Sequence, residues 1–175
     1  MKAEGRRQKA DFQRLAIVAL GSNLGDSRKF ILDAMARLQH LSDKPILKSS
    51  LWQTSPVDCQ PDSPNFVNAV VGFIPRKDET PGSLLGKLHA LETEFGRTPK
   101  MVVNESRPLD LDLIAFGAET RDTPELTLPH LRAHVRRFVL QPLSEIAPDL
   151  ILPGQGKTVA ELLAGLPAGE IVTRV

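Results

Sequence analysis

The sequence predicts an α+β domain, and three observations support this class. Its 175 residues are enough for one hydrophobic core and too few for two ordinary domains. Hydrophobic residues make up 41% and charged residues 25%, a balance typical of globular chains. Apolar runs of strand length alternate with stretches of helical periodicity, in the order strand, helix, strand, strand, helix, strand. We expect one domain over residues 15–175, preceded by a polar, basic tail over residues 1–14.

The first predicted strand is an apolar run over residues 15–20, which suits a buried strand. A helix follows it. Asp26 or Ser27 can cap this helix, because their side-chain oxygens accept hydrogen bonds from free backbone N–H groups. The apolar positions of the helix recur at helical spacing up to Leu41, and Pro45 ends it.

The second predicted strand covers residues 46–54, with imperfect alternation of apolar and polar residues. A loop over residues 55–65 follows, and it holds three prolines, two aspartates and little apolar material. Loops of this length are uncommon and often carry function. Residues 66–74 are rich in β-branched and aromatic residues and predict the third strand.

The second predicted helix begins at Thr80, which can cap it, and at Pro81, which fits the first helical turn. Leucines and one phenylalanine then form a single stripe, and Gly96 can end the helix. Residues 97–106 lack periodicity and predict a second long loop. Residues 109–116 form the clearest strand of the chain.

This order of elements is that of a ferredoxin-like βαββαβ sandwich, an antiparallel-rich sheet with two helices on one face. Helical additions follow at the C-terminal end. We expect a helical stretch over residues 133–146, broken near Pro142, and a last helix over residues 159–166. Thr158 and Glu161 have the spacing of a capping box for this last helix.

Charge and composition exclude several classes of protein. The net charge of +1 offers no basic footprint for nucleic acid or acidic lipid, and aromatic residues make up 5% of the chain. The single cysteine, Cys59, rules out an intrachain disulfide. No run reaches the roughly 18 apolar residues of a membrane helix, and residues 1–14 lack the apolar segment of a secretory signal. We therefore expect a cytoplasmic protein with no nucleic-acid or membrane partner.

The residues with the clearest chemistry are Asp110 and Asp112. Alternate residues of a strand share a face, so these two stand about 6–7 Å apart at Cα while three leucines point to the opposite face. Two like charges this close favour a divalent cation, and Mg²⁺ is commonly held by one or two carboxylates together with substrate phosphates. Taken alone, two ordinary acids on a solvent-facing strand are an equally good interpretation.

Basic residues around this strand favour a phosphate site. Arg107 lies just before the strand, and His130 follows a proline in a later loop. Further basic residues lie in flanking segments: Arg97, Lys100, Arg132, Arg136 and Arg137. Arginines around metal-bound carboxylates are typical of phosphoryl transfer, in which positioning and charge neutralisation supply most of the catalysis. Taken singly, each of these side chains fits a solvated surface better than a site.

Other functions remain open at this point. RNA-recognition modules share this order of elements, but they stack bases on sheet aromatics, and no segment here matches their aromatic signature. A regulatory ligand-binding domain of the same topology is a second alternative, and a protein that binds its ligand without turnover is a third. The segment Gly21–Gly25 matches neither glycine-rich nucleotide motif, and we interpret it as a turn.

Several segments together resemble a known enzyme family. They occur in one consistent order: Gly21–Leu24, Ser50–Pro56, Phe66–Asn68, Glu92, Gly96–Arg97, Arg107–Asp112, Leu128–His130, Arg136, Phe138 and Pro142–Pro148. The pattern Arg-x-x-Asp-Leu-Asp, followed by Pro-His and Glu-Ile-Ala-Pro at this spacing, is highly specific. Over residues 15–166 the chain is similar to the 6-hydroxymethyl-7,8-dihydropterin pyrophosphokinases of folate biosynthesis.

The resemblance implies a ferredoxin-like fold and the transfer of pyrophosphate from ATP to a pterin alcohol, by in-line attack on the β-phosphorus. It implies that Asp110 and Asp112 hold two Mg²⁺ ions. Arg97 and Arg107 would join them as catalytic residues. The residues implied to bind ATP are His89, Glu92, Arg97, Arg107, Thr127, His130 and Arg136. Those implied to bind the pterin are Thr54, Ser55, Val57, Phe66, Asn68 and Phe138, with the two phenylalanines on either face of the ring. ATP and the pterin alcohol are the implied partners, and we expect a monomer.

The chain departs from the family pattern at several positions. The family often has a basic residue, Trp, Gly and Pro before the arginine that precedes the aspartates, whereas residues 103–106 read Val-Asn-Glu-Ser here. Pro99 and Glu125 replace common arginines, and Leu131 replaces a common tyrosine. We expect altered ATP affinity and loop kinetics with catalysis retained, because the aspartate pair and the two central arginines remain.

Overall fold

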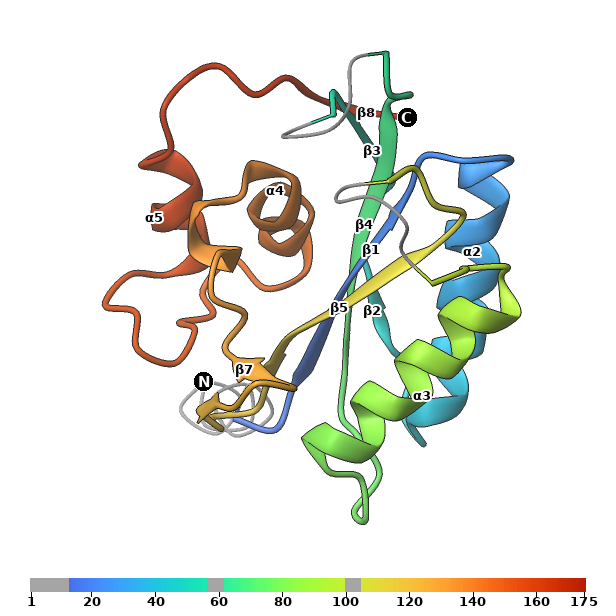
Figure 1. Cartoon of the computed structure of the whole chain (residues 1–175). Helices are drawn as coiled ribbons and strands as arrows, with labels where there is room; N and C mark the ends of the chain where they lie inside the picture. The colour runs from blue at the N-terminus through green and yellow to red at the C-terminus, as the bar shows by residue number, and fades with distance from the viewer. Residues whose placement is uncertain (1–12, 57–61, 100–104) are drawn as a thin grey trace.

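An antiparallel sheet forms the centre of the structure (Figure 1). The computed structural model describes residues 13–56, 62–99 and 105–175. The strand order is β5-β1-β4-β3-β8, with β2 also paired to β4, and each of these pairings is antiparallel. The strands are β1 (Ala16–Ser22), β2 (Leu47–Lys48), β3 (Trp52–Thr54), β4 (Phe66–Phe73), β5 (Asp110–Phe116) and β8 (Val172–Arg174). The predicted α+β class is confirmed.

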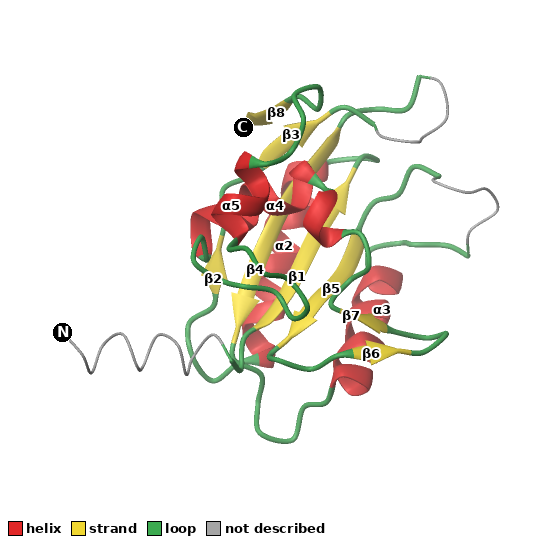
Figure 2. Cartoon of the chain, turned by 90° about the vertical axis from the view of Figure 1, so that its left-hand side faces the viewer, coloured by secondary structure: helices red, strands yellow, loops and turns green. Residues whose placement is uncertain are grey.

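Helices cover both faces of the sheet. On one face lie α2 (Ser27–Leu38) and α3 (Pro81–Glu94), and on the other lie α4 (Arg137–Ile146) and α5 (Val159–Ala164), as Figures 1 and 2 show from two directions. Each face has its own hydrophobic core. Alternate residues of β1 divide between the two, because Val18 and Leu20 join the core of α2 and α3 whereas Ile17 joins the core of α4 and α5.

The helix ends agree with the capping residues that the sequence predicts. Asp26 caps α2 by accepting a hydrogen bond from a backbone N–H of its first turn at 3.1 Å. Thr80 caps α3, and Gly96 follows that helix with a φ of +89°, which favours glycine. Thr158 and Glu161 form the predicted capping box of α5.

The single strand expected over residues 46–54 is wrong, because the structure divides it into β2 and β3. Their pairing with β4 shifts by one residue between the two strands. At this break the Ser49 N–H donates to the Val70 carbonyl at 3.0 Å, and the Ser49 hydroxyl accepts from the Val70 N–H at 2.9 Å. The hydroxyl thus replaces a backbone acceptor and stabilises a β-bulge.

The helical stretch over residues 133–146 is interrupted at Arg136, and the expected break near Pro142 is wrong. A turn of 3-10 helix over Ala133–Val135 precedes Arg136, whose backbone is extended with φ −102° and ψ 112°. α4 then begins, and Pro142 lies inside it as a buried residue. The missing proline N–H costs one helical hydrogen bond, and the residue is buried within the helix instead of ending it.

Three short strands have no counterpart among the predicted elements. β8 pairs with β3, and β6 (Arg121–Asp122) pairs with β7 (Thr127–Leu128) in a separate two-stranded sheet. Strands of two or three residues have too little pattern to be recognised without their partners. Among the residues described, none of the helices has the length and apolar content needed to span a membrane.

Candidate active site

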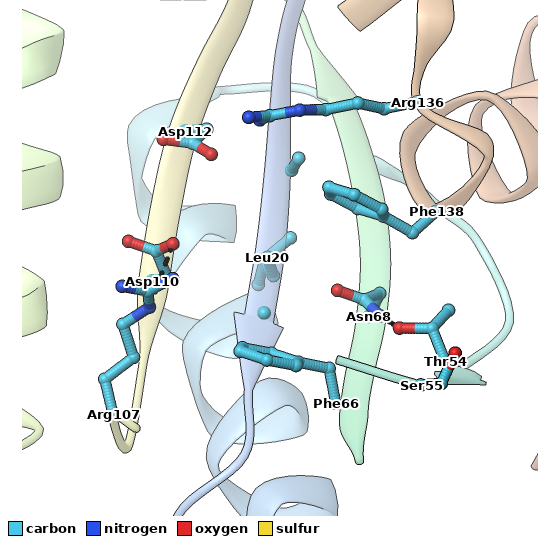
Figure 3. A pocket seen from close by; sticks show the side chains of 12 residues that line it. Leu20, Thr54, Ser55, Phe66, Asn68, Arg107, Asp110, Asp112, Arg136 and Phe138 are labelled. Atoms are coloured by element: carbon cyan, nitrogen blue, oxygen red, sulfur yellow. Dashed lines mark hydrogen bonds and ion pairs between the residues drawn. The ribbon is translucent and has the colours of Figure 1, made fainter. Parts of the chain in front are cut away.

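The two aspartates extend from β5 on the face opposite to the core of α2 and α3. Leu109, Leu111 and Leu113 are at most 3% exposed and lie in that core. Asp110 and Asp112 are partly exposed and line a cavity on the other face (Figure 3). The alternation predicted for this strand is therefore present, with both carboxylates on one side.

This first cavity has about 690 Å³ of empty space, which includes space open to solvent. β1 forms the floor at Ala19, Leu20 and Gly21, and the Leu20 side chain itself is buried in the core on the opposite face. Phe66 from β4 and Phe138 from α4 lie on opposite sides of the space in front of Leu20, with the aspartates along a third side (Figure 3). The cavity is thus a slot between two aromatic rings.

The side of the slot facing the aspartates is polar. Asn68 Nδ2 donates to Thr54 Oγ1 at 2.8 Å, and both residues are buried. Ser55 follows Thr54 and also lines the cavity. A Cβ atom on Gly21 would lie 3.3 Å from Asn68 Oδ1, so a glycine there keeps the space beside the amide open. A buried amide at the edge of an aromatic slot suits a flat ring that carries hydrogen-bonding groups on its rim.

Each aromatic wall is paired with a guanidinium group. Arg107 lies over the Phe66 ring at 5.8 Å from its centroid, and Arg136 lies over the Phe138 ring at 5.4 Å. Both distances are within the range of cation–π attraction. The two arginines therefore hold the walls and also line the cavity beside the aspartates.

A network of ion pairs fixes Asp110. The Arg97 guanidinium donates to Asp110 Oδ1 at 2.7 Å and to the Glu92 carboxylate. Arg107 Nε lies 3.2 Å from the other oxygen, Oδ2. Glu92 also accepts a hydrogen bond from the Leu111 N–H at 2.7 Å, so it joins α3 to β5 between the two aspartates.

Glu92 itself is buried, with 4% of its surface exposed. Burial raises the pKa of its carboxyl to about 7, although the hydrogen bond from Leu111 and the charge of Arg97 act in the opposite direction. The negative charges of Asp110 and Asp112 raise this pKa further. The side chain is held by Leu111 and Arg97, and it is not among the residues that line the cavities next to the aspartates.

A second cavity adjoins the first. It encloses about 730 Å³, again partly open to solvent, and lies between α3, β5 and the segment around β7. His89, Glu125, Thr127 and His130 line it, together with leucines of neighbouring positions. Asp112 lines both cavities. Two ligands, one in each cavity, would therefore meet at this carboxylate.

The two titratable groups at this junction have shifted pKa values. Burial raises the pKa of Asp112, and the charge of Asp110 raises it further, whereas His130 and nearby arginines lower it. Burial lowers the pKa of His130. His130 Nδ1 accepts a hydrogen bond from the Arg132 N–H at 3.3 Å, so a neutral ring carries its proton on Nε2. His130 can then donate to an anion in the second cavity.

Asn23 connects both loops of the site to the end of β1. It is 4% exposed, and its Nδ2 donates to the Pro64 carbonyl at 3.4 Å and to Ser106 Oγ at 3.3 Å. Its Oδ1 accepts from the Arg107 N–H at 2.9 Å. The prediction of a turn for this segment does not include these contacts, and the sequence feature that points to them is a polar amide between a buried strand and a helix cap.

The structure brings together most of the predicted site residues. Thr54, Ser55, Phe66, Asn68 and Phe138 surround the first cavity with Arg107, Asp110, Asp112 and Arg136, and His89, Thr127 and His130 line the second. Glu92 and Arg97 lie behind this surface and hold Asp110 and β5. Val57 lies outside the described residues. The floor residues Ala19, Leu20 and Gly21 were not predicted, although β1 alternation places Ala19 and Gly21 on the same face.

Asp110 and Asp112 are the groups best placed to hold a metal ion. Within the described parts of the chain, no group of three or more His, Cys, Asp or Glu side chains could hold one. Mg²⁺ does not require such a group, because one or two carboxylates suffice when substrate phosphates and water complete its coordination. The donor set at this site therefore fits Mg²⁺ bound together with a polyphosphate.

Comparison with known proteins identifies the family. The family model described as 7,8-dihydro-6-hydroxymethylpterin-pyrophosphokinase (HPPK) matches residues 17–148. The chain belongs to this family. The match confirms the resemblance inferred from the sequence and the predicted enzyme class, an ATP-dependent diphosphotransferase.

Individual relatives agree with the family model. The 2-amino-4-hydroxy-6-hydroxymethyldihydropteridine pyrophosphokinase of Pseudomonas aeruginosa is 39% identical over 151 residues, which cover 86% of this chain and 90% of the relative. The protein of the same name from Haemophilus influenzae is 37% identical, covering 85% and 90%. The folic acid synthesis protein fol1 of Pneumocystis carinii is 37% identical over 82% of this chain, which spans 19% of that longer protein.

Solved structures support the fold. The Plasmodium falciparum HPPK-DHPS A437G structure with SDX-DHP has a TM-score of 0.66 at 15% identity, covering 86% of this chain and 45% of that one. The wild-type structure with pteroate has a TM-score of 0.64 at 12% identity. The chain spans less than half the length of these structures, and at such identities the likeness concerns the fold.

Proposed function

We propose that the protein transfers the pyrophosphoryl group of ATP to the hydroxymethyl oxygen of 6-hydroxymethyl-7,8-dihydropterin, in folate synthesis. The alcohol oxygen attacks the β-phosphorus in line, and the bond from that phosphorus to the oxygen bridging it to the α-phosphorus breaks. AMP leaves, the pterin diphosphate forms, and the hydroxyl proton passes to solvent. Membership in the pyrophosphokinase family supports this reaction.

The observation that carries the proposal is the position of Asp112 on the walls of both cavities. A flat ring in the first cavity and a nucleotide in the second bring the alcohol and the triphosphate to the same carboxylate. Such placement turns a reaction between two molecules into one between bound neighbours, which accounts for a large share of catalysis in transfer reactions.

The first cavity is the proposed pterin site. Phe66 and Phe138 stack on the two faces of the ring, and Asn68 hydrogen-bonds its rim. The bond from Asn68 to Thr54 holds the amide in one orientation, which fixes the donor and acceptor that the ring meets. Ser55 lines the same edge. We also retain Val57 as a proposed pterin contact from the family resemblance.

The second cavity is the proposed ATP site, with His89 and Thr127 beside the nucleotide and His130 donating to a phosphate. Arg107 and Arg136 line the first cavity next to the aspartates and would neutralise the charge that develops on the transferred group. Arg97 is proposed to bind the phosphates as well, and Glu92 supports it through their ion pair.

Asp110 and Asp112 are the proposed ligands of two Mg²⁺ ions, with ATP as the co-substrate. Mg²⁺, when bound, would neutralise the polyphosphate and lower the pKa of the alcohol. The protein's own part is to keep two carboxylates on one face of β5. The ion pairs of Asp110 with Arg97 and Arg107 hold one of them in place and offset the repulsion between the two.

Product analysis tests the reaction. The protein is incubated with ATP, MgCl₂ and the pterin alcohol, and the nucleotide products are identified by mass spectrometry. We expect AMP and a pterin that has gained two phosphates. ADP with a pterin monophosphate would indicate an ordinary kinase, and pterin binding without any nucleotide product would indicate a protein that binds but does not turn over.

The proposal extends to the setting of the reaction. We propose a ferredoxin-like classification for the fold, supported by the strand order β5-β1-β4-β3 and by α2 and α3 on one face. We propose residues 15–175 as the functional domain, acting as a monomer in the cytoplasm, where ATP is abundant. Sedimentation or size-exclusion chromatography with light scattering tests the monomer.

A further inference from the structure

The walls of the aromatic slot belong to different elements. Phe66 begins β4, within the sheet, whereas Phe138 lies in the first turn of α4, which packs across the sheet (Figures 1 and 3). The separation of the two rings therefore depends on how α4 is seated on β3 and β4. Buried apolar residues of α4, among them Leu140 and Leu143, hold the helix against the sheet. Apolar burial is strong but not directional, so it does not by itself fix the register of the helix.

Glu145 supplies a directional contact at the other end of this helix. It lies seven residues after Phe138, about two helical turns, so both side chains are on the same side of α4. One oxygen of its carboxylate, Oε2, accepts a hydrogen bond from the Ser50 N–H at 2.7 Å and another from Trp52 Nε1 at 3.2 Å. Hydrogen bonds to an ionised acceptor are the stronger ones.

The two donors lie at or just before the start of β3, the strand that ends at Thr54 beside the slot. Ser50 lies at the β-bulge between β2 and β3, where the regular pairing with β4 is interrupted. Trp52 begins β3 and pairs with Asn68 of β4 in the sheet. Two residues later in β3 lies Thr54, which accepts the hydrogen bond from the Asn68 amide. The Glu145 carboxylate thus connects the helix that carries Phe138 to the strand that orients Asn68.

We infer that Glu145 is a positioning residue of the pterin slot. It is not among the residues that line either cavity next to the aspartates, so it acts through α4 on Phe138 and through β3 on Asn68. Loss of its carboxylate lets α4 move against β3, which widens the slot and weakens stacking on the ring. The effect falls on the pterin and not on ATP, because the second cavity is built from α3, β5 and the segment around β7. The inference rests on the proposed function of the first cavity.

Three variants test it. Glu145→Leu removes both hydrogen bonds, whereas Glu145→Gln keeps a neutral oxygen that can accept both. Trp52→Phe keeps an aromatic ring and removes one donor. Glu119→Leu is the matched control, because Glu119 is an exposed acid with an ion pair to Arg121, next to β6 and away from α4.

The measurements are the Kd of the pterin alcohol by fluorescence titration without ATP, the KM of each substrate, kcat and the melting temperature. We expect Glu145→Leu to raise the Kd and KM for the pterin about five- to twentyfold, as loss of two charge-assisted hydrogen bonds allows. The KM for ATP and kcat should stay within about twofold of wild type, since the energy lost is pterin binding energy. Glu145→Gln should restore most of the pterin affinity, Trp52→Phe should lose about two- to fivefold, and Glu119→Leu should match wild type.

Several outcomes overturn the inference. One is a Glu145→Leu variant with unchanged affinity for the pterin. Another is a Glu145→Leu variant that loses affinity for ATP as much as for the pterin. A third is a Glu145→Gln variant that binds the pterin as weakly as Glu145→Leu does. If Glu145→Leu does not fold, Trp52→Phe and Glu145→Gln decide, because a Trp52→Phe variant with wild-type pterin affinity excludes the role. Wild-type protein that forms no AMP from ATP and the pterin alcohol overturns the proposed function itself, which is a different result from wild-type turnover that the variants leave intact.

Discussion

Asn23 and Arg107 are joined by two hydrogen bonds, both of which involve the backbone of Arg107. The Arg107 N–H donates to Asn23 Oδ1 at 2.9 Å, and the Asn23 N–H donates to the Arg107 carbonyl at 3.2 Å. Arg107 in turn reaches Asp110 and the Phe66 ring. The end of β1 therefore sets the position of an arginine that contacts both the acidic side and one aromatic wall of the site.

Replacement of Asn23 tests this relationship. Asn23→Ala removes a buried acceptor and two donated hydrogen bonds, so we expect a loss of about 1–3 kcal/mol in the free energy of unfolding, measured by urea denaturation. Displacement of Arg107 should lower kcat/KM about 10- to 100-fold, since small errors in position are costly in transfer reactions. An Asn23→Ala enzyme as active as wild type would show that Arg107 is held by other contacts.

The aspartate pair should be essential for turnover but not for folding. We expect Asp110→Ala and Asp112→Ala each to reduce AMP formation by several orders of magnitude, roughly a thousandfold or more, because each removes a proposed metal ligand at the reacting phosphate. Circular dichroism should report a folded protein in both cases, because neither side chain belongs to a hydrophobic core. A near-wild-type rate in either variant would rule out the proposed metal pair.

Metal removal provides a complementary test that leaves the chain unchanged. Chelation of divalent cations with EDTA should abolish AMP formation, and added MgCl₂ should restore it. We expect isothermal titration to detect Mg²⁺ binding mainly when a non-hydrolysable ATP analogue is present, because two carboxylates alone form an incomplete coordination shell. Full activity in EDTA would contradict the assignment.

The aromatic slot should control pterin affinity without affecting ATP. Phe138→Ala removes one of the two stacking walls, and we expect it to raise the Kd for the pterin about 10- to 100-fold, in line with stacking energies of flat rings on aromatic side chains. Phe138→Tyr keeps the ring and serves as the control. Equal losses for pterin and ATP would mean that Phe138 supports the whole site rather than one face of one substrate.

The buried Glu92 should make stability depend on pH. Its pKa is about 7 in the folded protein and near 4.5 in the unfolded chain, so the folded state binds more protons between these values. The stability linked to this proton is fully present below pH 4.5 and is lost as the pH rises through 7. Compared with Glu92→Gln, which stays neutral, wild type should therefore lose unfolding free energy over this range. Parallel pH profiles of the two proteins would contradict the shifted pKa.

Local patterns in the sequence were sufficient for much of the fold and for the acidic strand. Leu109, Leu111 and Leu113 alternate with Asp110 and Asp112, as expected for a strand with one apolar and one polar face. This pattern can be recognised from the segment alone, without knowledge of its tertiary contacts. The caps of α2, α3 and α5 are likewise local, since each cap residue bonds to the helix that it begins.

Other features depend on contacts between distant segments and could not be predicted in this way. β8 is three residues long and is a strand because β3 lies beside it. Arg136 has an extended backbone that interrupts a helical pattern, and its side chain lies over the Phe138 ring and lines the cavity. Glu92 and His89 share a spacing of three on α3, yet one is buried against Leu111 and the other lines a cavity, and that difference is decided by the position of β5.

The place of β8 has a practical consequence for handling the protein. β8 pairs Val172 with Thr54, and the Val175 N–H donates to the Leu51 carbonyl, so the last residues flank the strand that supports the amide of the slot. The other edge of β8 has no strand paired to it in the described sheet, and such edges readily accept a foreign strand. A peptide that pairs with this edge would lie one strand away from β3, which carries Thr54 of the slot, so added peptide tags should be removed before affinities are compared.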